Sequence, residues 1–525
     1  MYPFNELIMK NLPIGIQTFE EIINNDYLYV DKTEVINKLI TSGKYYFLSR
    51  PRRFGKSLLI STLKEIFNGN KELFKGLSIY DKIQWELHPV IHISFSSITY
   101  SQSTVIFQNE IIDKLKYIGK QYGVYIAGST LNSVFNKLLQ ELSKINNVVI
   151  LIDEYDKPII DYITKLNKAY ENRDVLRDFY SSIKDNDQYI KFCFLTGVSK
   201  FSKVSVFSGL NNLKDITLDD RFSTICGITQ DELNIYFDDR IPALSIKDQI
   251  SEDLLKLKIK QWYNGYSWDG VNTVYNPFSI LNYFTDGKFK NYWFSTGTPT
   301  FLIDKFRETN FKVENINNFM ATDDLFDSYD LENFDYRSLL FQTGYLTIAN
   351  LDTSNMIYTL NYPNKEVKDS FLTHILTTFI KKEVSDIRLL NIQLQNSLIN
   401  NDLDSFINFI KSLFAGIPYQ LHIEKEAYYH SLFYVIMELV GIEMISELST
   451  SRGRIDGVIE LAQYIYIIEF KYITKNQNVE ELLVSAINQI RDKEYFAPYI
   501  KRNKPIKYLA VALNKEIIEY RIESE

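Results

Sequence analysis

Residues 45–59 read YYFLSRPRRFGKSLL, and the interpretation of the whole chain starts from this stretch. A short apolar run leads into a basic loop, then into Gly55, Lys56 and Ser57, and then into apolar residues with helical spacing. A phosphate-binding loop needs this order of strand, loop and helix start, because backbone N–H groups and the positive end of the helix dipole must converge on one anion. In such a loop Lys56 binds the β and γ phosphates, and the Ser57 hydroxyl is a ligand of Mg²⁺.

The loop departs from the usual pattern, GxxxxGK[ST], at its first position. Arg50 stands where the first glycine is expected, and the next residue, Pro51, has no N–H group to donate. A second interpretation therefore stays open at this point, in which GKS is a common tripeptide and the arginines form a solvated basic turn. The residues expected to bind a nucleotide are Arg53, Phe54, Gly55, Lys56, Ser57 and Leu58.

The composition is that of a globular protein of several domains. The chain has 525 residues, of which 45% are hydrophobic and 24% charged, so two to four domains can each bury a core. The formal net charge of −8 argues against binding of nucleic acid by bulk electrostatics, since such domains are usually basic. Any contact with nucleic acid must then be local.

Cysteine usage and hydropathy indicate a cytoplasmic protein. The two cysteines, Cys193 and Cys226, exclude a disulfide framework and suit buried thiols in a reducing compartment. No charged and then apolar leader opens the chain, and no apolar run approaches the roughly 18 residues of a membrane span. The five histidines lie too far apart for a compact zinc motif. We therefore expect no membrane partner.

Residues 147–154, NVVILIDE, predict a buried strand that ends in two carboxylates. Continuous apolar strands are typical of parallel sheets, whose carboxyl ends open onto the ligand crevice. Asp153 would then order the Mg²⁺ shell, and Glu154 would act as general base on the attacking water. The alternative is that Asp153 only caps the next helix.

Further apolar strands alternate with helices, which is typical of a doubly wound α/β sheet. Thr196, at the end of the strand 190–195, is a candidate sensor of the γ phosphate, although a strand-end threonine is more often a cap. Lys200, Lys203 and Arg221 are candidates for a positive charge added across a domain or subunit interface, as in a homo-oligomer.

The sequence predicts four regions. Residues 1–225 form the nucleotide-binding domain, residues 226–325 a helical lid, residues 326–420 a helix and hairpin followed by a helical connector, and residues 421–525 a second α/β domain. The helix and hairpin suit a winged helix and many other small α+β modules. Near the N-terminus we expect a strand at 26–30 and then a helix-like segment from Lys32 to Leu39. Lys32 and Thr33 are expected to be exposed.

The second candidate site lies in RGRIDGVIELAQYIYIIEFK, residues 452–471. Two strands joined at Ala462 and Gln463 would place Asp456 directly opposite Glu469, with Cβ atoms about 5 Å apart. Two carboxylates that close repel each other unless they share a proton or bind a divalent cation. Lys471 projects on the same face as Glu469 and could orient or activate a metal-bound water.

The alternative for this stretch is a surface hairpin with a salt bridge between Glu469 and Lys471. The second strand is apolar on both faces, which favours a buried, central strand. Gln489 on a following helix could touch substrate, and His430 and Glu438 on a preceding helix are weaker candidates for the metal shell.

Several motifs follow one another along nearly the whole chain: RPRRFGKS, ILIDEYD, SGLNNLKDITL, WYNGYSW with NPFSILNY, GRIDGVIE and IIEFK. In this order they resemble the AAA-ATPase-like family of bacteria and archaea that carries a C-terminal PD-(D/E)xK nuclease-like domain. That family's own loop variant also lacks the first glycine. The resemblance implies a P-loop NTPase fold followed by a restriction-endonuclease-like domain, with ATP and Mg²⁺ as cofactors. It assigns Lys56, Ser57, Asp153 and Glu154 to the nucleotide site, and Asp456, Glu469 and Lys471 to the nuclease signature.

The leading hypothesis is an ATPase whose nucleotide cycle gates a metal-dependent nuclease acting on DNA or RNA, with Ser57, Asp153, Asp456 and Glu469 as metal ligands. A rival hypothesis is an ATP-controlled switch whose C-terminal domain binds nucleic acid or a protein without cleavage. A third is a scaffold with a decayed loop, which would bind no ATP.

Overall fold

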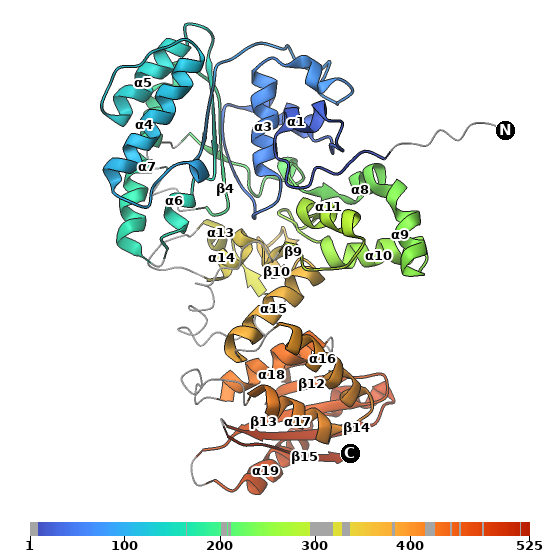
Figure 1. The fold of residues 1–525 in the computed structure, drawn as a ribbon. Helices are drawn as coiled ribbons and strands as arrows, with labels where there is room; N and C mark the ends of the chain where they lie inside the picture. The colour runs from blue at the N-terminus through green and yellow to red at the C-terminus, as the bar shows by residue number, and fades with distance from the viewer. Residues whose placement is uncertain are drawn as a thin grey trace, which may run out of the picture. The chain divides into compact units, whose positions relative to one another are not determined.

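The protein is described by a computed structural model that covers residues 9–524 except 164, 201–206, 208–209, 211, 294–318, 328–335, 381–383, 415–425, 441–443, 451–452, 475–476 and 515. The described chain divides into two compact units (Figure 1). The first ends at Val367 and the second begins at Lys368. Each unit is described by itself below.

The first unit is built on a parallel sheet of five strands in the order β2-β3-β4-β1-β5. The strands are β1 (Tyr45–Ser49), β2 (Val90–Ser94), β3 (Val148–Asp153), β4 (Ile190–Gly197) and β5 (Lys214–Asp215). Every residue of β1 and β3 is buried, as expected for parallel strands covered on both faces. The doubly wound sheet predicted from the sequence is confirmed, and β4 lies between β1 and β3.

Helices cover both faces of this sheet (Figure 1). They are α1 (Phe19–Asn24), α2 (Thr33–Ser42), α3 (Lys56–Phe67), α4 (Thr104–Gln121), α5 (Leu131–Leu142), α6 (Lys157–Ile160) and α7 (Leu166–Asp185). In α5 the buried residues recur every three or four positions from Leu131 to Leu142, so one apolar stripe faces the core. Helices α4, α5 and α7 pack together, whereas α1 packs on α3.

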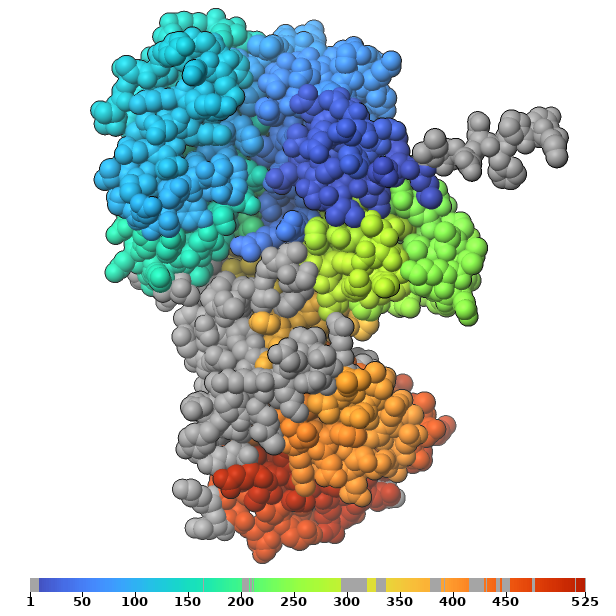
Figure 2. Space-filling model, in the orientation of Figure 1, coloured from blue at the N-terminus to red at the C-terminus, as the bar shows by residue number. Residues whose placement is uncertain are grey.

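A mainly helical region follows, as the sequence predicted. It contains β6 (Ile228–Thr229), α8 (Gln230–Phe237), α9 (Ile241–Asp248), α10 (Glu252–Tyr263), β7 (Val274–Tyr275) and α11 (Pro277–Asp286). A capping box is present at the start of α8, where Thr229 and Glu232 bond reciprocally. The space-filling view shows this region, in green to yellow-green, against the blue N-terminal segment (Figure 2).

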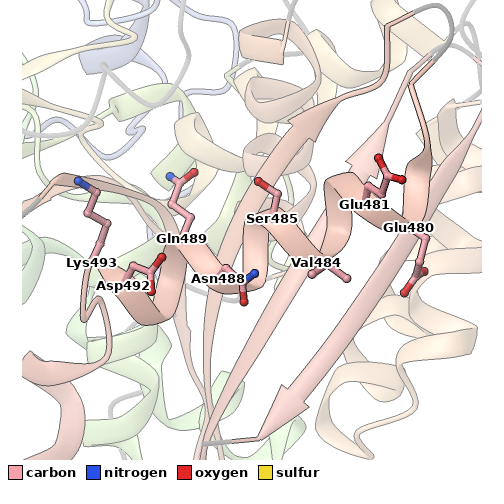
Figure 3. Close-up of a pocket in the computed structure, with 8 residues that line it drawn as sticks. All are labelled: Glu480, Glu481, Val484, Ser485, Asn488, Gln489, Asp492 and Lys493. Atoms are coloured by element: carbon pink, nitrogen blue, oxygen red, sulfur yellow. The ribbon is translucent and has the colours of Figure 1, made fainter.

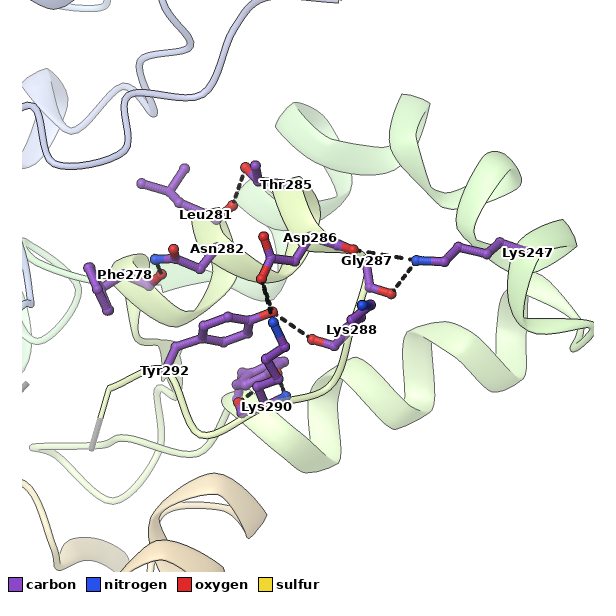
Figure 4. Close-up of polar contacts among 11 residues, drawn as sticks. Lys247, Phe278, Leu281, Asn282, Thr285, Asp286, Gly287, Lys288, Lys290 and Tyr292 are labelled. Atoms are coloured by element: carbon purple, nitrogen blue, oxygen red, sulfur yellow. Dashed lines mark hydrogen bonds and ion pairs between the residues drawn. The ribbon is translucent and has the colours of Figure 1, made fainter. Parts of the chain in front are cut away.

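The C-terminal end of α11 is tied to α9. Gly287 adopts a left-handed φ of 58°, which suits a helix C-cap, and Lys247 from α9 donates a 2.7 Å hydrogen bond to its carbonyl oxygen (Figure 4). Asp286 pairs with Lys290 at 2.9 Å and accepts a hydrogen bond from the Tyr292 hydroxyl at 3.2 Å. These contacts fix the turn that leads out of α11.

The first unit ends with a helix and a hairpin, as the sequence predicted. Its elements are β8 (Phe319–Ala321), α13 (Asp324–Asp327), α14 (Tyr336–Thr343), β9 (Thr347–Asp352) and β10 (Ile357–Asn361), and the sheet order is β8-β10-β9. Gly344, between α14 and β9, has a φ of 91° and lies against Pro51 of the loop after β1. This module therefore contacts the candidate nucleotide-binding loop.

The second unit contains a mixed sheet in the order β11-β12-β13-β14-β15. Its elements are α15 (Lys365–Ile380), which begins in the first unit, α16 (Val384–Ile399), α17 (Leu403–Phe414), α18 (Glu426–Val440), β11 (Met444–Thr450), β12 (Gly453–Glu460), β13 (Ile465–Tyr472), α19 (Val479–Asp492), β14 (Ile506–Leu513) and β15 (Ile518–Ser524). Only β13 and β14 pair in parallel, and α19 connects them, as a parallel crossover requires. Ile465 and Ile467 of β13 pack with Leu483 and Ile487 of α19.

Two expectations for the N-terminal segment are wrong. Residues 26–30 form no strand, because Asp26 turns the chain at a φ of 53° and the Leu28 N–H bonds to the Asn11 carbonyl outside any sheet. Thr33 is fully buried, and the Lys32 side chain is only 12% exposed because it pairs with Glu232 at 2.6 Å. Among the described helices, none combines the length and apolar character needed to cross a membrane.

Candidate active sites

The loop between β1 and α3 has the backbone of an anion-binding turn. Gly55 precedes the first residue of α3 with a φ of 89°, and Arg53 is also left-handed, with a φ of 67°. A left-handed arginine is rare, and such strained residues cluster at functional sites. The first N–H groups of α3 have no partner within the helix and can bind an anion at this end.

The Lys56 side chain folds back onto the loop and bonds to its backbone. Its ammonium group donates hydrogen bonds of 2.8 Å to the carbonyl oxygens of Arg50 and Pro51. Burial lowers the pKa of Lys56, while Asp153, Asp156 and other nearby charges oppose the shift. The ammonium group of Lys56 thus lies at the centre of the loop. There, phosphate oxygens could replace the two carbonyl oxygens as hydrogen-bond partners of Lys56.

Ser57 joins the loop to the end of β3. Its hydroxyl donates a 2.6 Å hydrogen bond to Asp153 Oδ2, and Asp153 Oδ1 accepts the Glu154 N–H at 2.9 Å. The structure therefore brings together the two segments that the sequence placed at one crevice. A hydroxyl and a carboxylate oxygen in contact are the kind of oxygen ligands that Mg²⁺ prefers.

Glu154 follows Asp153 and has the environment of a proton acceptor. Its backbone is left-handed, with a φ of 52°, and its Oε2 atom is buried with no hydrogen-bond partner among the described residues. Burial raises the pKa of Glu154, and the charge of Asp153 adds to the shift. Backbone strain and an unpaired carboxylate oxygen are both costly, and such features cluster at functional sites.

These groups line one cleft of about 470 Å³, within the size range of small-molecule sites. The loop contributes all of its expected binding residues except Phe54, and the wall also includes Asp153 and Glu154. The loop residues that line the cleft are Arg52, Arg53, Gly55, Lys56, Ser57 and Leu58. Arg52 was not among the residues that the sequence singled out.

A smaller, mostly apolar pocket of about 100 Å³ adjoins this cleft. The two share Pro13, Gly55, Leu58, Pro277 and Leu281. The expected nucleotide-binding residue Phe54 lies here, packed edge-on against the rings of Tyr266 and Trp268. An apolar pocket beside a phosphate cleft suits a flat, aromatic base.

Arg50, which replaces the first glycine of the usual pattern, does not enter the cleft. Its fully buried guanidinium donates 2.9 Å hydrogen bonds to the carbonyl oxygens of Ser49 and Thr217. The same group lies 3.9 Å from the ring of Trp268. Because the side chain is directed into the interior, the substitution leaves the phosphate-binding side of the loop open.

The candidates for an additional cation or a phosphate sensor have other partners. Lys200 pairs with Asp215 at 2.8 Å, and Arg221 pairs with Asp219 at 2.5 Å. The Thr196 hydroxyl donates to the Leu48 carbonyl oxygen at 2.8 Å, so it stabilises the β1–β4 contact as a strand-end cap. Lys203 lies outside the described residues. None of the three described candidates lines this cleft, and a part for Lys200 or Arg221 at an interface stays a prediction.

In the second unit, β12 and β13 pair in the register that the sequence predicted. Gly457 lies opposite Ile468 and Glu460 opposite Ile465, and the same register continued by one position would set Asp456 opposite Glu469. The ladder stops there, and Asp456 Oδ2 accepts the Phe470 N–H at 2.8 Å in its place. The Asp456 carboxylate is thereby held against the backbone of β13.

Lys471 and Glu469 meet Gln489 of α19 in one cluster. The Lys471 ammonium donates 2.9 Å and 2.8 Å hydrogen bonds to Glu469 Oε1 and Gln489 Oε1, and the Gln489 amide nitrogen donates to Glu469 Oε1. The Glu469 side chain is 3% exposed and that of Lys471 is 23% exposed, so the pair is no surface salt bridge. Gln489 also lines an open groove of about 570 Å³ along α19, beside Ser485, Asn488 and Asp492 (Figure 3).

The two weaker candidates for the metal shell differ in their positions. His430 Nε2 lies 2.8 Å from the Asp456 carbonyl oxygen, and its ring packs on Phe470. His430 therefore supports the backbone of the site through that nitrogen. Glu438 pairs with Lys368 instead, which contradicts the expectation that it joins the site.

Lys507 of β14 lies on the other side of the sheet from this site. Lys507 lies in register with Tyr466 and donates a 2.6 Å hydrogen bond to Asn401, on the face of the sheet opposite to Glu469. Among the described residues, no group of three or more His, Cys, Asp or Glu side chains is arranged to hold a metal ion.

Comparisons with known proteins match both parts of the chain that carry the candidate sites. Residues 13–207 match a family model described as "Predicted AAA-ATPase", and residues 424–522 match one described as "PD-(D/E)XK nuclease superfamily". A protein of Azotobacter chroococcum mcd 1, described as "Uncharacterized protein in vnfD 5'region", is 38% identical. That alignment covers 98% of this chain and 99% of the relative.

Proposed function

Because the chain belongs to the family of AAA-ATPase-like proteins with a C-terminal PD-(D/E)XK nuclease-superfamily domain, we propose that it hydrolyses ATP in its first unit and cleaves nucleic acid in its second. The observation that carries the first activity is the 2.6 Å contact between Ser57 and Asp153 beside Lys56 and Glu154. These are a phosphate-binding cation, two oxygen ligands and a carboxylate with an unpaired oxygen, gathered in one cleft.

The geometry supports a distinct part for each residue of the first site. Lys56 exchanges its two loop carbonyl partners for phosphate oxygens, and Ser57 with Asp153 holds Mg²⁺, which when bound neutralises charge on the β and γ phosphates. Glu154 accepts a proton from the attacking water as the new bond to the γ phosphorus forms. The bond from that phosphorus to the bridging oxygen breaks, and ADP leaves with the oxygen.

The apolar pocket beside the cleft supports ATP rather than inorganic polyphosphate as the substrate. Its position next to Gly55 and Leu58 lets a base fill it while the phosphates lie on the loop. The raised pKa of Glu154 also suits a general base, because a stronger base takes the proton more readily.

For the second activity, the proposal rests on Asp456 and Glu469, which the hairpin register would set opposite each other if it continued one position past Gly457, and on Lys471, which bonds to Glu469. Two carboxylates fit a divalent ion, preferably Mg²⁺, which when bound supplies a water of lowered pKa. Lys471 would orient the attacking water or stabilise the developing charge on the phosphate, and Gln489 positions Lys471. DNA and RNA are the proposed substrates.

One observation favours the rival function, an ATP-controlled switch without cleavage. Lys471 and Gln489 already occupy Glu469 Oε1, and no cluster of three metal-binding side chains occurs in the described part of the chain. In that case the C-terminal domain would bind nucleic acid or a partner protein and leave it intact.

The full-length chain and two variants separate the functions. Lys56→Ala is expected to abolish ATP hydrolysis, and Lys471→Ala to abolish Mg²⁺- or Mn²⁺-dependent cleavage of labelled DNA and RNA while leaving ATP hydrolysis intact. Cleavage that persists in Lys471→Ala would exclude the proposed nuclease site. A chain that hydrolyses ATP and binds nucleic acid but never cleaves it would support the switch.

We also propose that the protein works in a reducing compartment such as the cytoplasm. Its two cysteines, Cys193 and Cys226, are both buried and free, which is the usual state of such residues where thiols stay reduced.

A further inference from the structure

We propose that Arg52 and Arg53 supply, from the same chain, the guanidinium charge that stabilises the γ phosphate during hydrolysis, so that no arginine from a neighbouring subunit is required. This inference rests on the proposed ATPase function. It assigns a role to the two arginines of the loop, of which only Arg53 was expected to bind the nucleotide and neither was expected to supply this charge.

Arg52 and Arg53 both lie at the cleft proposed to bind ATP. Both arginines line the same cleft as Lys56, Asp153 and Glu154, so their side chains border the space that the phosphates would occupy. They belong to the loop itself, and therefore reach this space without any movement of a second subunit.

Arg52 and Arg53 are available to bind an anion, whereas the other candidate cations have partners. Arg50 is committed to carbonyl oxygens in the interior, and the earlier candidates Lys200 and Arg221 are committed to aspartates. Arg52 and Arg53 are exposed, and within the described part of the chain neither forms a salt bridge. Their charge is free to meet an anion.

The loop that carries them is held from several sides. The Arg52 carbonyl oxygen accepts a 3.1 Å hydrogen bond from the Trp293 indole, and the Arg53 guanidinium lies 4.9 Å from the ring of Phe278 at the start of α11. Next to them, Pro51 packs on Gly344, where an added Cβ would come within 2.8 Å of the proline ring. A held loop presents its charges with little reorganisation, which is the condition for strong electrostatic stabilisation.

Two acidic side chains of the cleft already have other partners, so Arg52 and Arg53 stay available to the substrate. Among the acids that line it, Asp156 accepts hydrogen bonds from the N–H groups of Val198 and Ser199, and Asp161 pairs with Lys157 at 3.2 Å. The groups that remain are Asp153, Glu154, Lys56, Arg52 and Arg53. Because Mg²⁺ cancels only part of the triphosphate charge, two further cations complement the bound nucleotide.

The test measures ATP hydrolysis and ATP binding separately in the full-length chain. Arg52→Ala/Arg53→Ala is expected to lower kcat by roughly a thousandfold, while the Kd of a fluorescent ATP analogue changes far less. The single variants show which arginine dominates, and guanidinium ion at a concentration too low to unfold the chain should restore part of the rate. Arg177→Ala, which removes a guanidinium paired with Asp174 on α7, is the matched control and should hydrolyse at the parental rate.

Concentration dependence provides the second readout. If the charge comes from the same chain, the parental rate per chain should stay constant on dilution. The inference is overturned if the double variant keeps the parental kcat, if its whole loss is explained by weaker binding, or if the rate per chain falls on dilution. Absence of Lys56-dependent hydrolysis in the parent would instead overturn the proposed function, and the inference with it.

Discussion

Gly265 lies directly against Pro363, so close that a Cβ on the glycine would overlap the proline carbonyl oxygen. Gly265 follows α10 in the motif WYNGYSW and has a φ of 114°, and Pro363 precedes α15, the helix that leads into the second unit. The same motif provides Tyr266, which packs against Phe54 of the loop. The motif thus contacts both the candidate nucleotide-binding loop and the segment just before α15.

Gly265→Ala is expected to destabilise the first unit by more than about 3 kcal/mol, because it adds a steric overlap with backbone to the cost of a left-handed alanine. Urea unfolding followed by tryptophan fluorescence measures the change. Gly76→Ala is the matched control, since Gly76 has a φ of 84° and no atom near its added Cβ. Equal effects in the two variants would show that the contact with Pro363 is not tight.

Glu154→Gln should lower kcat for ATP by roughly a hundredfold to ten-thousandfold and leave ATP binding intact, because only the proton acceptor is lost. The parental pH profile gives an independent check. The base must be ionised to act, and burial raises its pKa, so the acidic limb should lie above the pH expected for an ordinary glutamate. An acidic limb at the pH expected for an ordinary glutamate, or full activity in the glutamine variant, would exclude Glu154 as the base.

Glu366, at the start of α15, should make stability fall as pH rises. It is fully buried, and burial raises its pKa from 4.5 to about 7, although Ser279 Oγ and the Trp293 N–H donate hydrogen bonds to it. The folded state therefore holds the proton more tightly than the unfolded state does. The resulting stability is present below pH 4.5 and is lost as the pH rises to 7, by about 3 kcal/mol.

Glu366→Gln removes the titrating group while keeping an acceptor for Trp293 N–H, so its unfolding midpoint in urea should change less across this pH range than that of the parent. Glu171→Gln, on the exposed face of α7, controls for the loss of one carboxylate and should retain the parental pH dependence. Parallel curves for the parent and Glu366→Gln would contradict the raised pKa.

Both sites could be predicted from the sequence where local pattern decides the geometry. Parallel strands end at one edge of their sheet, so a loop after one strand and Asp153 after another must meet there, as the contact with Ser57 shows. A two-residue link fixes the register of a hairpin, and the predicted register is observed from Glu460 and Ile465 up to Gly457 and Ile468.

Partners distant in sequence could not be predicted in this way. The direction of Arg50 depends on Thr217 and Trp268, and that of Thr196 on a carbonyl of the neighbouring strand. A basic residue in a loop and a hydroxyl at a strand end each suit several partners, and only the packed fold selects one. Lys32, expected at the surface, is buried for the same reason.

Gln489→Ala tests the cluster in the second unit. The Gln489 amide holds both Lys471 and Glu469, so its loss should lower metal-dependent cleavage by about tenfold to a hundredfold, the usual cost of removing a group that orients a ligand. Asn488→Ala, one position along the same helix and exposed in the groove, should cleave at the parental rate. Because truncation of a half-buried glutamine leaves the apolar stripe of α19 intact, thermal unfolding should be nearly unchanged. Parental cleavage by Gln489→Ala would mean that Lys471 keeps its position without the amide, and that Glu469 alone orients the ammonium group.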